Sequence, residues 1–435
     1  MEVAINQEDA VSPLSGGLSL RRNFVWTLTG NSLYAACQWG MLVALAKLGS
    51  PNMVGQFALG LAISGPLMMS TNFYLRTVMA TDVHNEYRFG HYLGLRLLAT
   101  VLAFHAIILI AIVGNYRWQT ALVVILIGLA KSVENVSDIF YGLYQKFERL
   151  DRIAIAMMIR GIGSLVGFAL AIWLTGRLAW AVTALAGWWA VVLLTYECRT
   201  GKALLNTVLP HEKIRPTWEW PKLRRLLRLS LPLGVVMVLA SLNTNIPRYF
   251  VEHYHGEAAL GYFAALGYIM VAGYTVMGAL GQSATPRLAR YNVSNHAGYR
   301  RLLTKMLALA VAVGGVGILL AALLGRPLLT LLYRRDYAEY ANVFVWVMVA
   351  AAISYIGSML GYGMAAARIY RAQVPLFATS CLGIAATCAL LVKPRGLLGA
   401  AFALVVGASI TVIGASGILM FRSNKASKPA EAETG

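Results

Sequence analysis

The chain has 435 residues, of which 58 % are hydrophobic and only 13 % are charged. Soluble domains carry about 25 % charged residues, so the composition excludes a soluble protein, and the apolar content excludes a disordered one. The net charge of +19 would suit a nucleic-acid-binding protein, but membrane proteins also concentrate Lys and Arg in their cytoplasmic loops. We therefore expect an integral membrane protein that has no nucleic-acid partner.

The predicted elements are transmembrane helices, because the apolar runs are continuous and about 20 residues long, the length that spans a bilayer. A transmembrane β-barrel would instead show alternating apolar and polar residues. The basic pair Arg21-Arg22 precedes a run too long for a signal peptide, so the first run is predicted to be an uncleaved span. The twelve runs are 24–47, 53–75, 93–113, 119–142, 153–175, 178–196, 229–251, 259–283, 302–325, 341–367, 373–392 and 396–421.

A basic, proline-containing segment separates the runs into two sets of six. The expected parts are a cytoplasmic tail at 1–20, an N-terminal bundle at 21–197, a cytoplasmic linker at 198–228, a C-terminal bundle at 229–421 and a tail at 422–435. Gly55-Gln56-Phe57-Ala58 and Gly261-Tyr262-Phe263-Ala264 fall at corresponding places in the two halves. We therefore expect an all-α fold with two six-helix bundles related by a pseudo-twofold axis along the membrane normal, a recurrent plan of transporters.

The loop charges predict the orientation of these helices. With the N-terminus in the cytoplasm, the inside segments hold most of the 37 Lys and Arg residues, and the outside loops are short. The positive-inside rule then places both termini in the cytoplasm. The four cysteines show no metal-type spacing, and no nucleotide-binding loop, metal-binding His pair or G-x-S-x-G elbow is present. No metal, cofactor or enzymatic activity is expected.

Charged residues inside the predicted spans mark a first candidate site. Lys131, Glu134 and Asp138 follow one face of the run 119–142, and Arg160 lies at a similar depth in the next run. A charge at mid-membrane costs at least a few kcal/mol, so these residues are expected to face the bundle interior. Three interpretations stay open: a structural ion network, direct contact with substrate, or ion coupling in which Glu134 and Asp138 share a proton beside Arg160.

A second candidate site is a polar stripe on the run 229–251. Its members are Ser241, Thr244, Asn245, Arg248 and the adjacent Tyr249. Pro247 is expected to interrupt this helix, and broken polar helices at the boundary between halves are typical of transport sites. The first run carries a matching stripe, Asn31, Tyr34 and Gln38. Interhelical hydrogen bonds and a snorkelling arginine are the alternative interpretations.

Two more arginines, Arg76 and Arg287, lie at the inner ends of their predicted helices. Arginines at such positions usually serve only as positive-inside anchors. At the mouth of a central cavity they would instead be placed to meet an anionic head group such as a phosphate.

Four motifs carry a family resemblance. They are Trp26-Thr27-Leu28-Thr29-Gly30-Asn31, Asn245-Ile246-Pro247-Arg248-Tyr249-Phe250, Gly261-Tyr262-Phe263 and Gln282-Ser283-Ala284-Thr285-Pro286-Arg287-Leu288-Ala289. These motifs resemble bacterial polysaccharide flippases, the Wzx-type exporters of O-antigen and capsule. The resemblance covers residues 21–422 and indicates the flippase branch of the multidrug/oligosaccharidyl-lipid/polysaccharide exporter superfamily.

The resemblance implies two bundles around a V-shaped cavity, alternating access, and a place in the bacterial inner membrane. The implied substrate is an oligosaccharide on undecaprenyl pyrophosphate, moved from the cytoplasmic to the outer leaflet, with membrane lipids and the polymerase and glycosyltransferases of the same pathway as partners. The family's basic cavity residues would correspond to Arg76, Arg248 and Arg287, and amide and aromatic side chains would meet the sugar. The expected substrate-binding residues are thus Arg76, Arg248, Arg287, Asn31, Gln38, Asn245 and Tyr249, and the expected ion-coupling residues are Lys131, Glu134, Asp138 and Arg160.

Two other functions stay open. A multidrug antiporter of the same superfamily would favour an acidic, aromatic cavity for cationic drugs, whereas the helices at the half-boundary here carry arginine. A membrane polysaccharide polymerase or glycosyltransferase would present catalytic carboxylates on a long outer loop. The longest outer loop here, 326–340, is short and carries only Asp336 and Glu339 as acidic residues.

Reporter fusions test the predicted topology. Fusions after residues 50, 116, 255 and 335 should place the reporter outside the cytoplasm, and fusions after residues 85, 210, 295 and 370 should place it inside. The physical reason is the charge asymmetry of the loops, which orients the helices during insertion. The measurement is reporter activity on each side of the membrane, and two or more fusions on the contrary side would overturn the topology.

Overall fold

The computed structural model describes residues 20–73, 75–82, 86–210, 212–367, 369 and 372–426. All but the last residue of the expected tail 1–20, and residues 427–435 of the expected C-terminal tail, lie outside these ranges. Within the described ranges every regular element is a helix, which confirms the prediction of an all-α protein.

The elements follow the predicted runs closely. The first are α1 (Leu20–Leu48), α2 (Pro51–Asn72), α3 (Leu75–Thr81), α4 (Phe89–Val113), α5 (Trp118–Lys146), α6 (Leu150–Thr175), α7 (Leu178–Val192), the π-helical η1 (Leu193–Glu197) and α8 (Cys198–Val208). The remaining elements are α9 (Trp220–Ser294), α10 (His296–Leu332), the 3₁₀-helical η2 (Arg335–Tyr340), α11 (Ala341–Ala366), α12 (Gln373–Arg395) and α13 (Leu397–Ala426). Each of the predicted runs falls largely on helical residues.

Ten helical segments in the described part of the chain are long and apolar enough to cross a membrane. The segment α1 is not one of them, and α9 contributes a single segment although it covers two predicted runs. Within α9 the backbone departs from helical geometry at Gly256, where φ is 78° and ψ is −178°. Only glycine adopts this conformation readily, so Gly256 divides α9 into a first arm, 220–255, and a second arm, 257–294.

The predicted interruption at Pro247 is wrong, because the residues on both sides of this proline are helical. A proline inside a membrane helix removes one backbone hydrogen bond, but the freed carbonyl finds other partners in a packed bundle. The chain reverses its direction at Gly256, which lies between the predicted runs 229–251 and 259–283 and has a positive φ.

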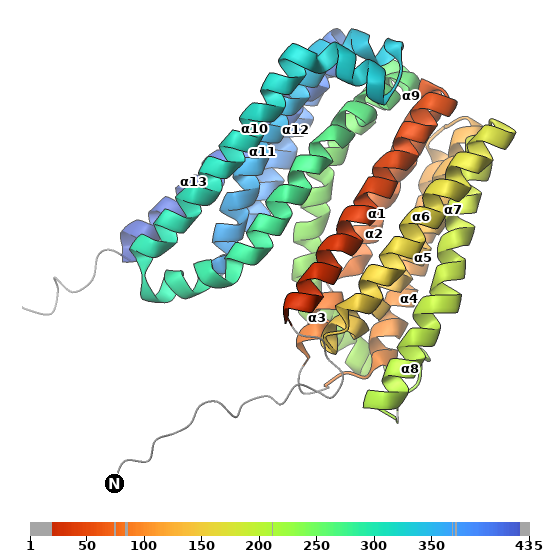
Figure 1. The fold of residues 1–435 in the computed structure, drawn as a ribbon, viewed down its shortest axis with the longest axis vertical. Helices are drawn as coiled ribbons and strands as arrows, with labels where there is room; N and C mark the ends of the chain where they lie inside the picture. Colours follow the sequence, from red (N-terminus) through yellow and green to blue (C-terminus); the bar gives the residue numbers. More distant parts are fainter. Residues whose placement is uncertain are drawn as a thin grey trace, which may run out of the picture.

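The helices form two groups that meet at one end and diverge towards the other (Figure 1). We call α1 to α8 the N-lobe, and α10 to α13 with the second arm of α9 the C-lobe. The bend of α9 lies at the joined end, whereas α3, α8 and both ends of the described chain lie at the diverging end, which we call the open end. The first arm of α9 therefore runs along the space between the lobes.

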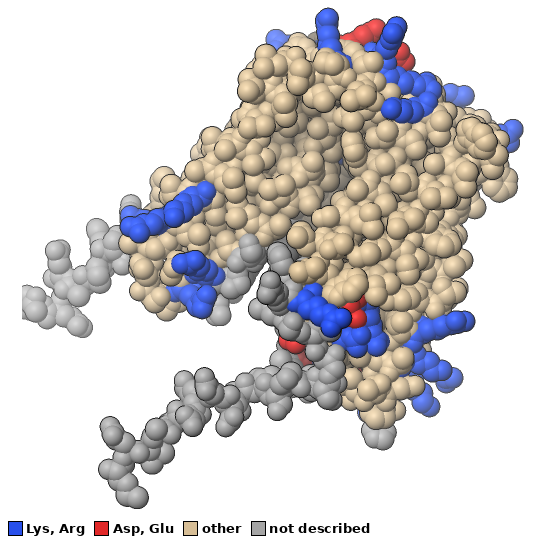
Figure 2. Space-filling model, viewed as in Figure 1, with Lys and Arg blue, Asp and Glu red and all other residues tan. Residues whose placement is uncertain are grey.

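The surface suits a protein that spans a bilayer. Lys and Arg gather at the two ends of the molecule, with a broad uncharged band between them and a hollow between the lobes (Figure 2). Large apolar side chains are exposed around the outside, including Trp173, Leu323 and Leu390. An apolar belt between charged ends is the surface expected of a protein surrounded by lipid.

Close backbone packing of α2 against α9 joins the two lobes. A Cβ atom at Gly55 would lie 1.7 Å from the carbonyl oxygen of Glu257, and one at Gly261 would lie 2.1 Å from that of Pro51. These two glycines are the first residues of the matching motifs in the two halves. Only glycine permits this approach of the two helices.

Polar contacts close the joined end as well. The Glu257 carboxylate accepts hydrogen bonds from Gln56 Nε2, at 2.9 Å, and from the Thr120 hydroxyl. The Tyr249 hydroxyl donates to the Ala62 carbonyl of α2, and Arg334 Nη2 donates to the carbonyl of Lys47 at 2.6 Å. The lobes are thus bonded directly to each other at this end.

The expected linker, 198–228, is mostly helical. Its first part is α8, which continues α7 through the π-helical turn, and its last part is the start of α9. The residues between them contact the start of α4, where Thr217 N donates to the Gly90 carbonyl at 2.9 Å. At the start of α9, Arg225 lies 2.9 Å from Glu86. This segment is therefore bonded to the N-lobe.

Two glycines of the second arm of α9 provide a matched test of the joined end. We expect Gly261→Ala to destabilise the closed contact by about 1–3 kcal/mol through overpacking, whereas Gly267→Ala, where nothing lies within 4 Å of the added Cβ, should be neutral or stabilising by up to about 1 kcal/mol through helix propensity. The measurement is the thermal unfolding temperature of the purified variants in detergent. Equal unfolding temperatures for the two variants would contradict the packing described above.

Candidate functional site

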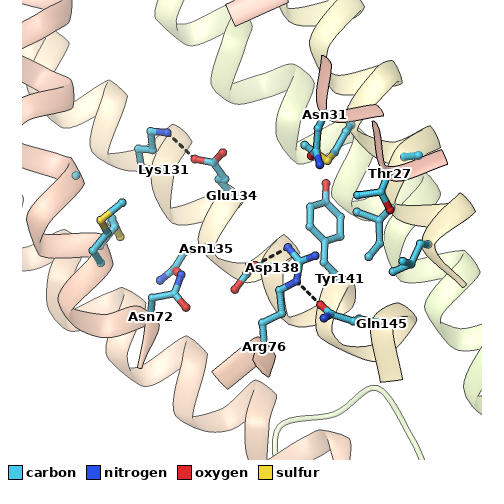
Figure 3. Close-up of a pocket in the computed structure, with 17 residues that line it drawn as sticks. Thr27, Asn31, Asn72, Arg76, Lys131, Glu134, Asn135, Asp138, Tyr141 and Gln145 are labelled. Atoms are coloured by element: carbon cyan, nitrogen blue, oxygen red, sulfur yellow. Dashed lines mark hydrogen bonds and ion pairs between the residues drawn. The ribbon is translucent and has the colours of Figure 1, made fainter. Parts of the chain in front are cut away.

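A cavity of about 680 Å³ lies in the N-lobe, between α1, α2, α3, α5 and α6 (Figure 3). Its polar lining residues are Thr27, Asn31, Asn72, Arg76, Lys131, Glu134, Asn135, Asp138, Tyr141 and Gln145. A cavity of this size holds a small molecule or one end of a larger one. Five residues that the sequence analysis singled out, Asn31, Arg76, Lys131, Glu134 and Asp138, are thus brought into one place.

One face of α5 supplies much of this lining. Lys131, Glu134, Asp138, Tyr141 and Gln145 follow one another at spacings of three and four residues. Such spacings place side chains on one stripe of an α-helix. The stripe is polar although the helix is embedded in an apolar bundle, so the cavity is a polar space inside the membrane domain.

Asp138 lies between two arginines of different character. Its Oδ2 atom is 3.0 Å from Nη2 of Arg96 on α4, and its Oδ1 atom is 3.5 Å from Nη1 of Arg76 on α3. The Arg96 side chain is fully buried, whereas 36 % of the Arg76 side chain is exposed. Arg96 also donates to Asn135 Oδ1 at 2.6 Å and to Asn72 Oδ1 at 3.1 Å. Arg96 is therefore a structural cation with a nearly complete set of acceptors.

Arg76 is the more available of these two cations. Its Nε atom donates to Gln145 Oε1 at 2.9 Å, and its guanidinium lies 5.7 Å from the centre of the Tyr141 ring. Figure 3 shows the side chain directed into the cavity beside Asp138. A partly exposed arginine with a loosely paired carboxylate can turn part of its hydrogen-bonding edge towards a ligand.

Glu134 has partners of its own. Lys131 Nζ lies 2.6 Å from its Oε2 atom, and the hydroxyl of Tyr34 on α1 donates to its Oε1 atom at 3.1 Å. Because Glu134 and Asp138 each face a different cation, the structure gives no direct bond through which they would share a proton. The expectation of a shared proton stays a hypothesis that this geometry does not favour.

Arg160 does not bond directly to either of these carboxylates, although its charge interacts electrostatically with Glu134. Among the described residues, Arg160 forms no hydrogen bond or ion pair with Glu134 or Asp138. Its Nη2 atom donates to Ser137 Oγ at 2.7 Å, and its Nε atom lies 4.0 Å from Oε1 of Glu197. The guanidinium also lies 5.0 Å from the centre of the Trp189 ring. Arg160 is therefore behind the wall of the cavity, in a fully buried pair with a carboxylate that sequence reasoning missed.

Glu197 was missed because the sixth predicted span was ended one residue before it. In the structure the helix continues through η1 into α8, so Glu197 is inside the lobe and fully buried. An acidic residue directly after an apolar run, next to the amphipathic α8, was the available signal.

The other predicted residues lie outside this cavity. Arg248 is half-buried on the first arm of α9 and donates from Nη1 to Asn245 Oδ1 at 3.2 Å. Among the described residues, no carboxylate lies within 4.0 Å of its guanidinium nitrogens. The hydroxyl of Tyr249 is bonded to α2 at the lobe contact, and Gln38 is half-buried on α1. Arg287 is exposed at the open end of the C-lobe, where its Nε atom donates to the Tyr291 hydroxyl at 2.9 Å.

Metal-ligating side chains do not gather in this structure. The described residues contain no group of three or more His, Cys, Asp or Glu side chains that could hold a metal ion. The polar groups of the site are arginine, lysine, amide and hydroxyl groups with separate carboxylate partners. This chemistry suits an anionic, hydroxyl-rich ligand.

Comparison with known proteins gives matches in sequence and in fold. A family model described as "Polysaccharide biosynthesis protein" matches residues 79–342. The chain is 27 % identical over 403 residues to the capsular polysaccharide biosynthesis protein CapF of Staphylococcus aureus, covering 90 % of this chain and 97 % of that protein.

Two solved structures share the fold. The lipid II flippase MurJ in an inward closed conformation matches with a TM-score of 0.72 and 12 % identity, over 91 % of this chain and 87 % of that one. A single-residue mutant of the Vibrio cholerae MATE transporter VcmN matches with a TM-score of 0.63 and 14 % identity, over 94 % and 97 % of the two chains. At these identities the likeness is one of fold.

The two arginines that contact Asp138 should differ in their effect on stability. We expect Arg96→Ala to cost about 3–5 kcal/mol, because it leaves buried acceptors without a donor, and Arg76→Ala to cost about 1 kcal/mol or less, because that ion pair is partly exposed. The thermal unfolding of both variants, purified in detergent, measures the difference. Similar losses of stability would show that the two arginines have the same structural role.

Proposed function

Because the chain belongs to the polysaccharide biosynthesis protein family, we propose that it carries an oligosaccharide on undecaprenyl pyrophosphate from the cytoplasmic to the outer leaflet of the bacterial inner membrane. The fold is shared with a lipid II flippase and with a MATE transporter, which supports a transporter of this superfamily. The proposed partners are membrane lipids and the polymerase and glycosyltransferases that act on the same lipid-linked sugar.

The observation that carries this proposal is the incomplete neutralisation of Arg248. Its side chain is half-buried on the first arm of α9, and its described hydrogen-bond acceptor is the side-chain amide oxygen of Asn245. An arginine at membrane depth without a carboxylate is costly. A pyrophosphate would supply the missing negative charge and match the planar guanidinium with two parallel hydrogen bonds.

The positions of the three arginines support a path for the head group. Arg76 and Arg287 lie on opposite lobes at the open end, and Arg248 lies on the first arm of α9, towards the joined end. The first two would capture the pyrophosphate, and Arg248 would hold it deeper in the molecule. Asn31 and Gln38 offer amide groups to the sugar, whereas the Asn245 amide is buried and bonded to Ser241 and Arg248. The prenyl tail needs no pocket if it stays in lipid.

Alternating access follows from the closed contact at the joined end. The described conformation is open on the side of the termini, which the loop charges place in the cytoplasm. For release, the bonds between Gln56, Thr120 and Glu257 would have to break while the open end closes. The Gly55 and Gly261 contact would then be the place about which the lobes move.

We also propose that α1 and both arms of α9 cross the membrane, which makes twelve spans with Gly256 at the outer turn. The reciprocal packing of the two matching glycines supports the pseudo-twofold relation of the halves, because corresponding residues meet at a twofold interface. The N-terminal bundle at 21–197 would then be one half and the C-terminal bundle at 229–421 the other.

A multidrug antiporter is the remaining alternative, since the MATE fold is shared. The cavity supports it poorly, because each carboxylate there already faces a cation of the protein, so a cationic drug would meet no free negative charge. A polymerase or glycosyltransferase would need catalytic carboxylates at the outer surface, which η2 offers only as Asp336 and Glu339.

Substitutions of Arg248 test the proposed substrate charge. In a flippase-null strain, Arg248→Ala should restore at most about a tenth of the surface polysaccharide, because a hydrogen bond to a charged group contributes about 1.5–3 kcal/mol. Arg248→Lys should restore part of it, because the charge remains while the planar fork is lost. Arg76→Ala and Arg287→Ala should also reduce transport by weakening capture.

The control is Arg224→Ala, which removes an exposed arginine from the same helix and should restore transport fully. Membrane levels of each variant are measured alongside the polysaccharide. Full restoration by Arg248→Ala would show that Arg248 only reaches towards the membrane surface, and the proposed head-group site would be wrong.

A further inference from the structure

Glu197 is a fully buried carboxylic acid at the end of the π-helical turn η1. A π-helical turn inserts an extra residue into a helix and is frequently found at functional sites. Here the turn separates α7 from α8, and the Glu197 side chain meets α5 and α6. The turn thus places an ionisable group directly behind the cavity wall.

The charge of this carboxylate is poorly compensated. Its Oε1 atom accepts one hydrogen bond, from the Tyr141 hydroxyl at 3.0 Å, and lies 4.0 Å from Arg160 Nε. Its Oε2 atom and the Arg160 Nε atom are buried without a hydrogen-bond partner. A buried ion pair is favourable only when its geometry is good and its remaining lone pairs are satisfied. Among the described residues, one oxygen of this carboxylate is buried without a hydrogen-bond partner.

The groups around Glu197 leave Arg160 as its nearest cation. On α5 the Tyr144 hydroxyl donates to the Glu197 backbone carbonyl at 2.7 Å, and on α6 Arg152 donates to the carbonyl of Thr200. The titratable and charged groups that surround Glu197 are Tyr141, Tyr144, Arg152, Arg160, Tyr196 and Cys198. None of these is a second carboxylate, but the charge of Arg160 also acts on Glu134, so a proton on Glu197 would change the electrostatic surroundings of Glu134 as well.

Tyr141 connects this buried group to the cavity. Its ring lines the cavity and lies beneath the Arg76 guanidinium, while its hydroxyl is bonded to Glu197. Arg160 is bonded to Ser137, the residue before Asp138. The pair of Glu197 and Arg160 is thus one side chain away from the cavity.

We propose that Glu197 is a proton-binding site whose protonation strengthens the binding of an anion in the N-lobe cavity. This inference rests on the proposed function, in which the anion is the pyrophosphate of the substrate. The charged groups in and behind the cavity are the cations Arg76, Arg96, Lys131 and Arg160 and the carboxylates Glu134, Asp138 and Glu197. Protonation of Glu197 removes the negative charge that faces Arg160. The charge of Arg160 is then uncompensated behind the cavity wall.

The proton has a simple route. A hydronium ion in the cavity gives its proton to the Tyr141 oxygen, while the hydroxyl proton of Tyr141 passes to Glu197 Oε1. One O–H bond breaks and one forms at the tyrosine, which ends in its original state, and the carboxylate becomes a neutral acid. By linkage, anion binding then favours proton binding to the same extent as proton binding favours the anion.

Calorimetry of the full chain in detergent tests this coupling, with inorganic pyrophosphate as the probe. Titrations in two buffers with different ionisation enthalpies give the number of protons taken up on binding. A unit charge about 10 Å from an anion, at an effective dielectric of about 20, changes affinity roughly tenfold. We therefore expect proton uptake by the wild-type protein and roughly tenfold tighter binding as the pH is lowered.

The variant Glu197→Gln imitates the protonated acid. It should bind pyrophosphate as tightly as the wild-type protein does at low pH, and the proton uptake that exceeds the probe's own titration should disappear. The control Glu148→Gln removes an exposed carboxylate from the turn between α5 and α6 and should keep the wild-type uptake. Comparison of the variants at one pH cancels the titration of the probe itself.

A second variant covers a failure of Glu197→Gln to fold. Tyr141→Phe keeps the aromatic ring beneath Arg76 but removes the hydrogen bond that stabilises the charged carboxylate. The pH dependence of its proton uptake on pyrophosphate binding should therefore differ from that of the wild-type protein. An unchanged pH profile in Tyr141→Phe, or unchanged uptake in Glu197→Gln, would overturn the inference.

The outcomes separate this inference from the proposed function. Pyrophosphate binding without proton uptake by the protein overturns the role of Glu197 and leaves the flippase proposal standing. Weaker binding by a folded Glu197→Gln overturns it too, because a structural carboxylate would give that result. No pyrophosphate binding by the wild-type protein at any pH overturns both proposals.

Discussion

The cost of burying a guanidinium group in a membrane determines how the N-lobe is packed. Arg96 is fully buried, and its acceptors are Asp138 and Asn135 on α5 and Asn72 on α2. These bonds require α2, α4 and α5 to lie side by side at one depth. Arg160 imposes the same requirement on α6 and its neighbours, because its contacts reach Ser137 on α5, Trp189 on α7 and Glu197 in η1. The polar cavity is the space that these two buried clusters leave between them.

The C-lobe is held together in a different way. Within the described ranges, every ion pair involves the N-lobe, the segment beneath it or the first turns of α9. The C-lobe relies on apolar packing and on tyrosine hydroxyls bonded to backbone carbonyls, such as Tyr333 to Ala265 and Tyr355 to Met270. The two lobes thus share a helical plan but differ in chemistry, which places the ionisable site in one lobe only.

Much of the fold was predictable from the sequence because the length and continuity of an apolar run determine whether it forms a spanning helix. The members of the α5 stripe were predictable as well, since helical spacing alone places them on one face. Glu197 as the partner of Arg160 was not predictable, because it depends on how far the helix predicted at 178–196 continues beyond its last residue. The turn between the runs 229–251 and 259–283 was predicted, and Gly256 lies within it. The interruption expected at Pro247 is absent, because the carbonyl freed by a proline can find other partners in a packed bundle.

The ion pairs of Asp138 and Glu134 determine which cation of the cavity can turn towards a substrate without leaving a carboxylate unpaired. If Arg76 turns towards a phosphate, Asp138 keeps its bond of 3.0 Å to the buried Arg96, so no carboxylate loses its only cation. If Lys131 turns instead, Glu134 keeps the Tyr34 hydroxyl as its hydrogen-bond donor and is left with the charge of Arg160, which Glu197 already compensates in part. Recruitment of Lys131 would therefore need another source of positive charge near Glu134. A protonated Glu197 provides one, because it leaves the charge of Arg160 uncompensated behind the same wall.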